Sequence, residues 1–217
     1  MDAEFWHQRW QSDRIGFHQK QVNAQLAQIW PQLGLAKQSQ VLVPLCGKSK
    51  DLLWLAALGH EVSGFELSPL AVADFFAEAN LKPQKQTLGP YQVWQADWLR
   101  IYQGDFFKAN QLNQHFDAAY DRAALIALPS HLRVQYVAQL AQLLKPNATL
   151  LLITVHYAPE QQQAPPFSVD ETEVHALFSP YFSIEKRGQV SEGQANLRVA
   201  SGELSFFDEL CFVLMRK

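Results

Sequence analysis

The sequence predicts an α/β protein with a doubly wound, mostly parallel sheet that carries helices on both faces. Short apolar runs rich in β-branched residues recur along the chain, as expected for strands that are buried on both sides of a sheet. Between these runs lie segments whose apolar residues have helical spacing. Glycine, serine or proline marks several junctions at which a helix starts or stops.

The first strand–helix–strand unit is the clearest. Val41-Leu42-Val43 has the composition of a short buried strand, and apolar residues at 52, 53, 55, 56 and 58 then follow at helical spacing. Gly59 is placed to end this helix in the left-handed conformation. The next strand is 61–66, after which Ser68-Pro69 supplies an N-cap and a proline at the first helical position.

The remaining elements continue this alternation less sharply. The last strand is the longest of the late ones and is expected to hold a bulge. In chain order, the sequence predicts helices at 4–10 and 23–30 before this unit, and after it strands at 91–94, 99–102 and 116–120, a helix at 132–144, a strand at 149–155, a helix at 170–178, and strands at 182–186 and 204–215.

Composition and charge exclude several classes of protein. Hydrophobic residues make up 48% and charged residues 18%, which excludes intrinsic disorder. A net charge of −3 gives no support for nucleic-acid binding, and no stretch approaches the ~20 apolar residues of a membrane helix. Two cysteines cannot form a disulfide framework, and the histidines lack metal-ligand spacing. We expect a cytoplasmic monomer without a metal, a membrane partner or a nucleic-acid partner.

The whole chain, 1–217, is expected to be one domain. Residues 39–217 would form the sheet core, and residues 1–38 an N-terminal helical cover. Three of the six tryptophans lie in the cover, namely Trp6, Trp10 and Trp30. Because a large aromatic side chain buries 150–250 Å² in general, packing alone would account for them. We favour a packed cover whose first turns also contact the ligand.

Ligands of doubly wound sheets bind beyond the carboxyl ends of the strands. The turn after the first strand, Pro44-Leu45-Cys46-Gly47-Lys48-Ser49, has one glycine and matches neither the P-loop nor the dinucleotide-binding pattern. Glu66 ends the second strand, where an acid accepts hydrogen bonds from ribose hydroxyls. The alternative is that Glu66 is a solvated charge before a helix, where the helix dipole stabilises it. A ribose acid without a pyrophosphate loop predicts an adenosine cofactor without phosphates, such as S-adenosylmethionine.

Two further positions follow predicted strands. Asp105 would contact the adenine amino group of such a cofactor, or it would cap a short turn, and the two hypotheses have equal weight. Asp121-Arg122 follows the fourth core strand and would form an ion pair at the end of the sheet. Alternatively, the planar guanidinium of Arg122 would hold the cofactor carboxylate or an anionic acceptor.

Several segments from the first helix onward resemble the thiopurine S-methyltransferase family. The Pro-Leu-Cys-Gly-Lys turn is the most specific of them, because most adenosylmethionine enzymes carry a more glycine-rich loop there. The segments are Phe5-Trp6-His7 with Trp10, Ile15-Gly16-Phe17-His18-Gln19, Val43-Pro44-Leu45-Cys46-Gly47-Lys48-Ser49, Gly59-His60-Glu61-Val62, Glu66-Leu67-Ser68, Tyr120-Asp121-Arg122-Ala123-Ala124-Leu125 and Pro165-Pro166-Phe167.

The resemblance implies a class I S-adenosylmethionine-dependent methyltransferase fold, with a seven-stranded sheet and a reversed last hairpin. It implies methyl transfer to the sulfur of aromatic and heterocyclic thiols, including thiopurines. In bacterial members, which this chain's short N-terminus resembles, it also implies methylation of selenium and tellurium species. The implied cofactor contacts are Trp10, Leu45, Glu66 and Arg122, with Asp105 and Phe106 beside the adenine, and the implied substrate contacts are Phe17 and Arg198.

For methyl transfer from a sulfonium, the protein mainly has to orient the reactants and exclude water. Orientation alone can lower the activation barrier by roughly 7–11 kcal/mol. A general base adds only about 10²–10⁴-fold. We therefore expect in-line transfer to a small thiol or selenol without an obligatory base, with Arg122 and Asp121 as candidate positioning residues. The alternative is a nucleotide-binding oxidoreductase or a non-enzymatic binder on the same Rossmann-like sheet.

Overall fold

The computed structural model describes residues 3–16, 18–162 and 164–217. The strands are β1 (Gln40–Val43), β2 (Glu61–Glu66), β3 (Gln84–Leu88), β4 (Tyr91–Ala96), β5 (Leu99–Gln103), β6 (Phe116–Asp121), β7 (Leu144–His156), β8 (Phe182–Ser191) and β9 (Asp208–Arg216). The α-helices are α1 (Ala3–Gln11), α2 (Ala24–Ile29), α3 (Asp51–Ala57), α4 (Pro69–Glu78), α5 (Ser130–Leu143), α6 (Glu171–Phe178) and α7 (Leu197–Ala200). Short 3₁₀ helices include Trp30–Leu33 and Phe106–Leu112.

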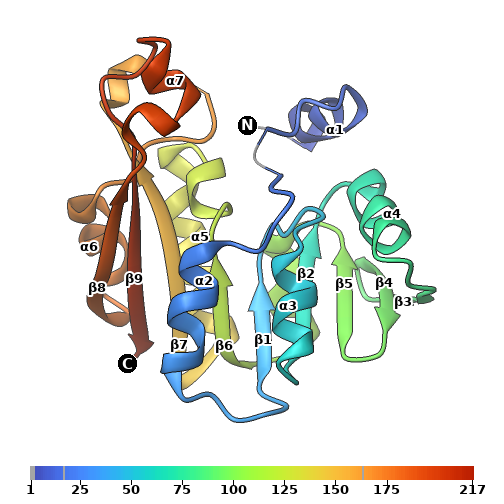
Figure 1. Cartoon of the computed structure of the whole chain (residues 1–217). Coiled ribbons are helices and arrows are strands. Elements are labelled where there is room, and N and C mark those ends of the chain that lie inside the picture. Colours follow the sequence, from blue (N-terminus) through green and yellow to red (C-terminus); the bar gives the residue numbers. More distant parts are fainter. Residues whose placement is uncertain (1–2, 17, 163) are drawn as a thin grey trace.

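Within the described residues, nine strands form one mixed sheet in the order β3-β4-β5-β2-β1-β6-β7-β9-β8 (Figure 1). The central pairings, from β5 through β2, β1 and β6 to β7, are parallel. The pairings at both edges are antiparallel. The predicted fold class is therefore confirmed, including the reversed final hairpin of β8 and β9.

The number of strands differs from the seven that the resemblance implies. The antiparallel strands β3 and β4 together extend one edge of the sheet beyond β5. All five residues of β3 are exposed, so its polar sequence shows no alternation by which a strand could be predicted. Pairing with β4, which includes the Lys85 ammonium over the Trp94 ring, gives this segment its strand conformation.

The two late strands also differ in their bounds from the prediction. The strand β9 begins at Asp208 and not at residue 204, while β8 extends to Ser191. The register irregularity lies in β8, between Lys186 and Gly188, and not in the last strand. Residues 192–207, which include α7, project as a hairpin-like segment beyond the end of the sheet (Figure 1).

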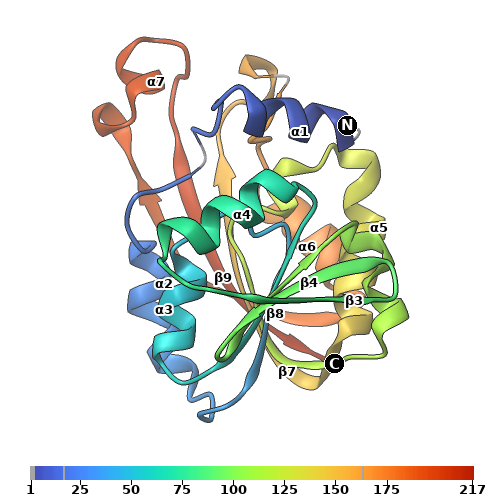
Figure 2. The same ribbon diagram turned by 90° about the vertical axis from the view of Figure 1, so that its right-hand side faces the viewer.

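Two apolar clusters pack on the two faces of the sheet and explain how the helices are distributed. One cluster contains residues of α2, α3 and α4, among them Leu26, Leu55 and Phe75. The other contains residues of α5 and α6, among them Val137 and Phe178. Figure 2 shows the resulting three layers, with α1 crossing above them. The carboxyl ends of the parallel strands therefore open toward α1.

The N-terminal segment is divided between these two places. Helix α1 lies beyond the carboxyl ends of the strands, near α4 (Figures 1 and 2). Helix α2 lies on the face of the sheet, where Leu26, Ile29 and Trp30 are part of the buried core. Of the predicted cover, α1 alone has the position of a lid, since α2 is a layer of the core.

Candidate functional site

The turn after β1 is held tightly against the end of β2. The Cys46 amide donates to the Phe65 carbonyl oxygen at 2.9 Å, and the Gly47 amide donates to Glu66 Oε2 at 2.8 Å. Leu45 and Gly47 both have positive φ angles, of 47° and 53°. A positive φ is costly for a leucine, so the turn stores strain that its hydrogen bonds to β2 offset.

Glu66 is a buried carboxylate at this turn, with 7% of its surface exposed. Besides Gly47, it accepts from the Ser68 amide, through Oε1 at 2.7 Å. Burial raises the pKa of the Glu66 carboxyl above its usual value, while these backbone hydrogen bonds act in the opposite direction. A carboxylate offers about four lone-pair positions, so each oxygen of Glu66 keeps acceptor capacity for a ligand hydroxyl.

Two side chains of α1 reach down to the same turn. Trp10 is buried, and its ring lies so close to Gly47 that a Cβ there would be 3.1 Å from Trp10 Cζ2. One helical turn earlier, His7 has a buried Nε2 atom without a hydrogen-bond partner among the described residues. The His7 side chain also lies within electrostatic reach of the Glu66 carboxyl. Buried polar atoms normally have a partner, so His7 Nε2 is suited to a polar ligand.

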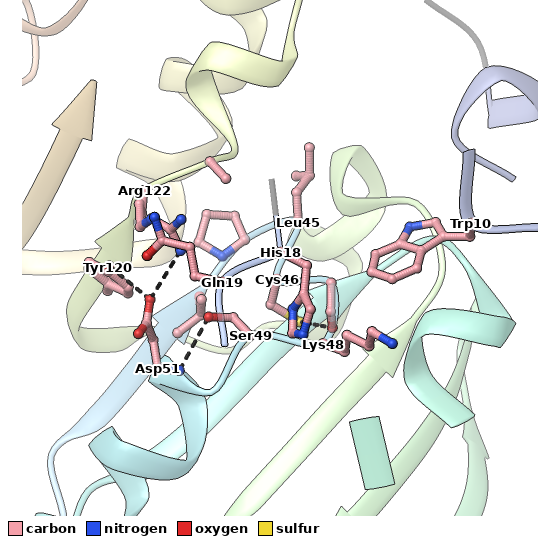
Figure 3. Close-up of a pocket in the computed structure, with 14 residues that line it drawn as sticks. Trp10, His18, Gln19, Leu45, Cys46, Lys48, Ser49, Asp51, Tyr120 and Arg122 are labelled. Atoms are coloured by element: carbon pink, nitrogen blue, oxygen red, sulfur yellow. Dashed lines mark hydrogen bonds and ion pairs between the residues drawn. The ribbon is translucent and has the colours of Figure 1, made fainter. Parts of the chain in front are cut away.

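Figure 3 shows a pocket beside this turn, between the segment after α1 and the ends of β1 and β6. Burial and then the charge of Lys48 lower the pKa of the His18 imidazole in its wall. Lys48 itself binds Glu78 of α4, with Nζ 2.6 Å from Oε1. The lining residues are Trp10, His18, Gln19, Val43, Pro44, Leu45, Cys46, Gly47, Lys48, Ser49, Asp51, Tyr120, Arg122 and Ala123.

Arg122 enters this pocket from the end of β6, and its Nη1 lies 3.6 Å from Asp51 Oδ2 (Figure 3). The hydroxyl of Tyr120 donates to the same Asp51 oxygen at 3.0 Å. The predicted ion pair of Arg122 at the sheet end is thus made with Asp51, at the start of α3. Asp51 is 1% exposed, so this charge interaction is shielded from water.

The carboxylate of Asp121 has a different surrounding. Its Oδ1 accepts from the amides of Ala124 and Leu125, and its Oδ2 accepts from the Tyr136 hydroxyl at 2.6 Å. Asp121 is fully buried, and burial raises the pKa of its carboxyl to about 6. These contacts hold the turn after β6, and the positioning role expected for Asp121 stays a prediction.

The two residues expected beside an adenine lie at the end of β5. Asp105 Oδ1 accepts from the Phe107 amide at 2.9 Å, so Asp105 caps the short helix that follows. The Phe106 ring is buried in the core and packs against Phe65 and Tyr136. Asp105 therefore caps the turn through its Oδ1 atom. Its other oxygen, Oδ2, is the atom that the adenine hypothesis would use.

The two predicted substrate residues are Phe17 and Arg198. Phe17 lies outside the residues that the structure describes. Arg198 lies in α7, where its guanidinium pairs with Glu203 at 2.7 Å, and it is not among the pocket-lining residues. Arg198 and the turn after β1 belong to segments that lie apart at the open end of the sheet (Figure 1).

Sequence reasoning missed two residues of this site. Asp51 follows the Gly47-Lys48-Ser49 turn directly, but no motif marks it, because its partners come from the far segments at residues 23, 120 and 122. His7 stands in the segment that carries the family resemblance, but the sequence predicts no role for it. Its i, i+3 spacing from Trp10 is the signal that places both on one face of α1.

The described part of the chain contains no group of three or more His, Cys, Asp or Glu residues placed to bind a metal ion. In the same residues, no helix combines the length and apolar character needed to cross a membrane.

Comparison with known proteins agrees with this geometry. The family model described as thiopurine S-methyltransferase (TPMT) matches residues 1–217. The chain is 44% identical over 218 residues to a thiopurine S-methyltransferase of Pseudomonas syringae pv. tomato, covering 100% of the chain and 99% of the relative. It is 42% identical to one of Shewanella baltica, covering both proteins completely.

Solved structures at lower identity share the fold. A SAM-dependent methyltransferase from Anabaena variabilis has a TM-score of 0.70 at 16% identity, covering 99% of this chain and 95% of that protein. A Burkholderia thailandensis 1,6-didemethyltoxoflavin-N1-methyltransferase, solved with bound S-adenosylhomocysteine, has a TM-score of 0.66 at 14% identity. It covers 99% of this chain and 87% of that protein.

Proposed function

This chain belongs to the thiopurine S-methyltransferase family, and we propose that it methylates the sulfur of small aromatic and heterocyclic thiols such as thiopurines. It is an S-adenosylmethionine-dependent methyltransferase. Selenium and tellurium species are proposed as further acceptors. The single observation that carries the proposal is the buried Glu66 carboxylate at the end of β2, beside a turn with only one glycine.

The residues around this turn fit the adenosylmethionine cofactor. Glu66 keeps acceptor capacity beyond its two backbone amides, which suits the two hydroxyls of a ribose. The buried His7 Nε2 lacks a partner among the described residues and is suited to a polar group of the same ligand. The absence of a pyrophosphate loop agrees with a ligand that carries no phosphate.

Each side chain then has a defined task. Glu66 would accept hydrogen bonds from the ribose of the bound cofactor, and Leu45 and Trp10 would exclude water from it. Arg122 holds the carboxylate of the cofactor, for which its planar guanidinium is suited. Asp105 contributes its remaining acceptor capacity to the adenine amino group, and Phe106 supports that turn from the core. Bound S-adenosylmethionine supplies a methyl group that is already activated for transfer.

We propose that the acceptor thiol ionises by itself, and that no histidine of the enzyme has to remove its proton. Burial lowers the pKa of the His18 imidazole in the pocket wall, which makes it a weaker proton acceptor. Cys46 is buried, and burial raises the pKa of its thiol well above the usual value, which opposes a nucleophilic role. Orientation in a dry pocket therefore carries most of the rate enhancement.

Two measurements test this function. Calorimetry with S-adenosylhomocysteine, NADH and ATP should detect binding of S-adenosylhomocysteine alone, whereas NADH binding would favour the oxidoreductase alternative. Mass spectrometry of reactions with a panel of thiols, selenite and tellurite should then detect methylated products with aromatic thiols. Cofactor binding without methylation of any thiol in the panel would contradict the proposed acceptor class.

A further inference from the structure

We propose that Asp51 is the positioning residue of this site, and that it holds the Arg122 guanidinium in the orientation that the ligand requires. The inference rests on the proposed function in one respect, since it takes Arg122 to contact the cofactor. The role of Asp51 itself follows from its contacts in the ligand-free chain.

Asp51 connects three segments that are far apart in the sequence. Its Oδ1 accepts from the Asn23 backbone amide at 2.9 Å, where the chain enters α2. Its Oδ2 accepts from the Tyr120 hydroxyl at 3.0 Å and lies 3.6 Å from Arg122 Nη1. Figure 3 shows Tyr120 and Arg122 converging on this oxygen from the end of β6. Both oxygens of Asp51 thus act as hydrogen-bond acceptors.

Because Asp51 is buried, its carboxylate depends on its hydrogen-bond donors and on the positive charge of Arg122. A buried carboxylate is strongly unfavourable unless hydrogen bonds and a cation compensate it. Tyr120 remains a donor, because burial and the Asp51 charge both raise the pKa of its hydroxyl well above the usual value. The side chain of Arg122 is 14% exposed. Its guanidinium is therefore held between the buried charge and the pocket.

Positioning follows from the flexibility of an arginine side chain. Ordering a long side chain during binding lowers affinity, and an arginine that is ordered beforehand avoids this loss. Asp51 also receives the Asn23 amide, so the same carboxylate anchors the segment that leads from α1 into α2. The position of Arg122 is thereby linked to the docking of the N-terminal segment.

Asp117 provides a matched control for a purely structural carboxylate. It lies on the same strand as Tyr120, at the opposite end, and likewise binds a backbone amide and a cation. Its Oδ2 accepts from the Gln40 amide at 2.8 Å, and its Oδ1 lies 2.6 Å from Lys145 Nζ. Asp117 is not among the pocket-lining residues.

The test is a double-mutant cycle with Asp51→Asn, Arg122→Met and their combination. Urea unfolding of the ligand-free proteins first measures whether the two residues are coupled. Calorimetry then measures S-adenosylhomocysteine affinity. We expect Asp51→Asn to weaken binding about tenfold, equivalent to 1.4 kcal/mol, and to have less than a twofold effect in the Arg122→Met background. Asp117→Asn should leave the affinity within twofold of wild type.

Several results would overturn the proposal. These are strictly additive effects on unfolding, equal loss of affinity in both Arg122 backgrounds, or an equal loss with Asp117→Asn. If Asp51→Asn does not fold, Asp51→Glu replaces it, since it keeps the charge but displaces it by one methylene, and the same loss of affinity is expected. A wild-type protein that does not bind S-adenosylhomocysteine would refute the proposed function, and the unfolding cycle would still decide the role of Asp51.

Discussion

The indole of Trp10 lies against Gly47 so closely that a methyl group on this glycine would approach Trp10 Cζ2 to 3.1 Å. Helix α1 and the turn after β1 are therefore fitted to each other, although 37 positions separate the two residues in the sequence. This contact joins the lid-like helix to the turn on which the cofactor is proposed to rest.

The first prediction concerns this contact. Gly47→Ala should lower the free energy of unfolding by about 1–2 kcal/mol for its left-handed backbone alone, and by more because the Trp10 ring must move. Gly34→Ala is the matched control, since Gly34 has a φ of 66° and no atom within 4 Å of an added Cβ. Urea unfolding of both variants measures the difference. If both variants lost the same free energy of unfolding, α1 would move away from the added methyl group without an energetic cost.

The second prediction separates the two tasks of Glu66. Glu66→Gln should keep an acceptor for one backbone amide but lose the charge, and S-adenosylhomocysteine binding should weaken by roughly 1.5–3 kcal/mol for each charge-assisted hydrogen bond lost. Glu66→Ala should in addition destabilise the turn at Gly47 and Ser68. Calorimetry and urea unfolding are measured on both variants. Wild-type affinity in Glu66→Gln would remove Glu66 from the cofactor site.

The third prediction concerns α1. Deleting residues 1–20 should leave the sheet folded, because α2 and its core residues remain, but it should abolish methyl transfer through the loss of Trp10 and His7. Far-ultraviolet circular dichroism checks the fold, and a methyl-transfer assay checks the activity. Full activity in the truncated protein would show that α1 serves only packing.

The fourth prediction concerns pH and Asp121. Its pKa is raised by burial from 3.8 to about 6, so the folded state binds a proton more tightly than the unfolded state. The resulting stabilisation is complete below pH 3.8 and is lost as the pH rises to about 6. At about 1.4 kcal/mol per pKa unit, it amounts to at most about 3 kcal/mol. Asp121→Asn should therefore gain stability relative to wild type across this range.

Asp117→Asn is the control of opposite sign for that experiment. Burial raises the pKa of Asp117, but the hydrogen bond from Lys145 and its other partners outweigh burial and lower it overall. The stabilisation from Asp117 is therefore present above its usual pKa of 3.8 and is lost at lower pH. Urea unfolding between pH 3 and pH 7 compares the three proteins. A constant difference between Asp121→Asn and wild type would contradict the assigned pKa.

The fifth prediction concerns the absence of an enzyme base. Thiols of lower pKa should reach their maximal methylation rate at lower pH, because the acceptor supplies its own thiolate. Burial lowers the pKa of His18, so a His18 base would instead impose one common inflection below pH 6.5 on every acceptor. Rate profiles for three thiols, with wild type and His18→Ala, distinguish these cases. A shared inflection that His18→Ala removes would refute the base-free mechanism.

Local sequence signals predicted the parts of the structure that depend on neighbouring residues. Ser68-Pro69 marked the start of α4 correctly, and the Ser68 side chain accepts from the Ala71 amide as an N-cap should. The alternation of strands and helices predicted the doubly wound sheet and placed Glu66 at its carboxyl edge. These signals are reliable because capping and apolar periodicity act over a few residues.

The sequence alone thus determined the fold class, the strand ends on which a ligand site is built, and the family. Tertiary structure decided the rest: that β3 joins the sheet, that α2 packs on its face, and that Arg122 pairs with Asp51 and not with Asp121. Each of these depends on residues that are distant in the sequence and meet only after the chain has folded. Polar residues such as Asn23, Asp51 and Arg122 follow no periodic pattern in the sequence. They become partners because the folded chain buries them together in one site.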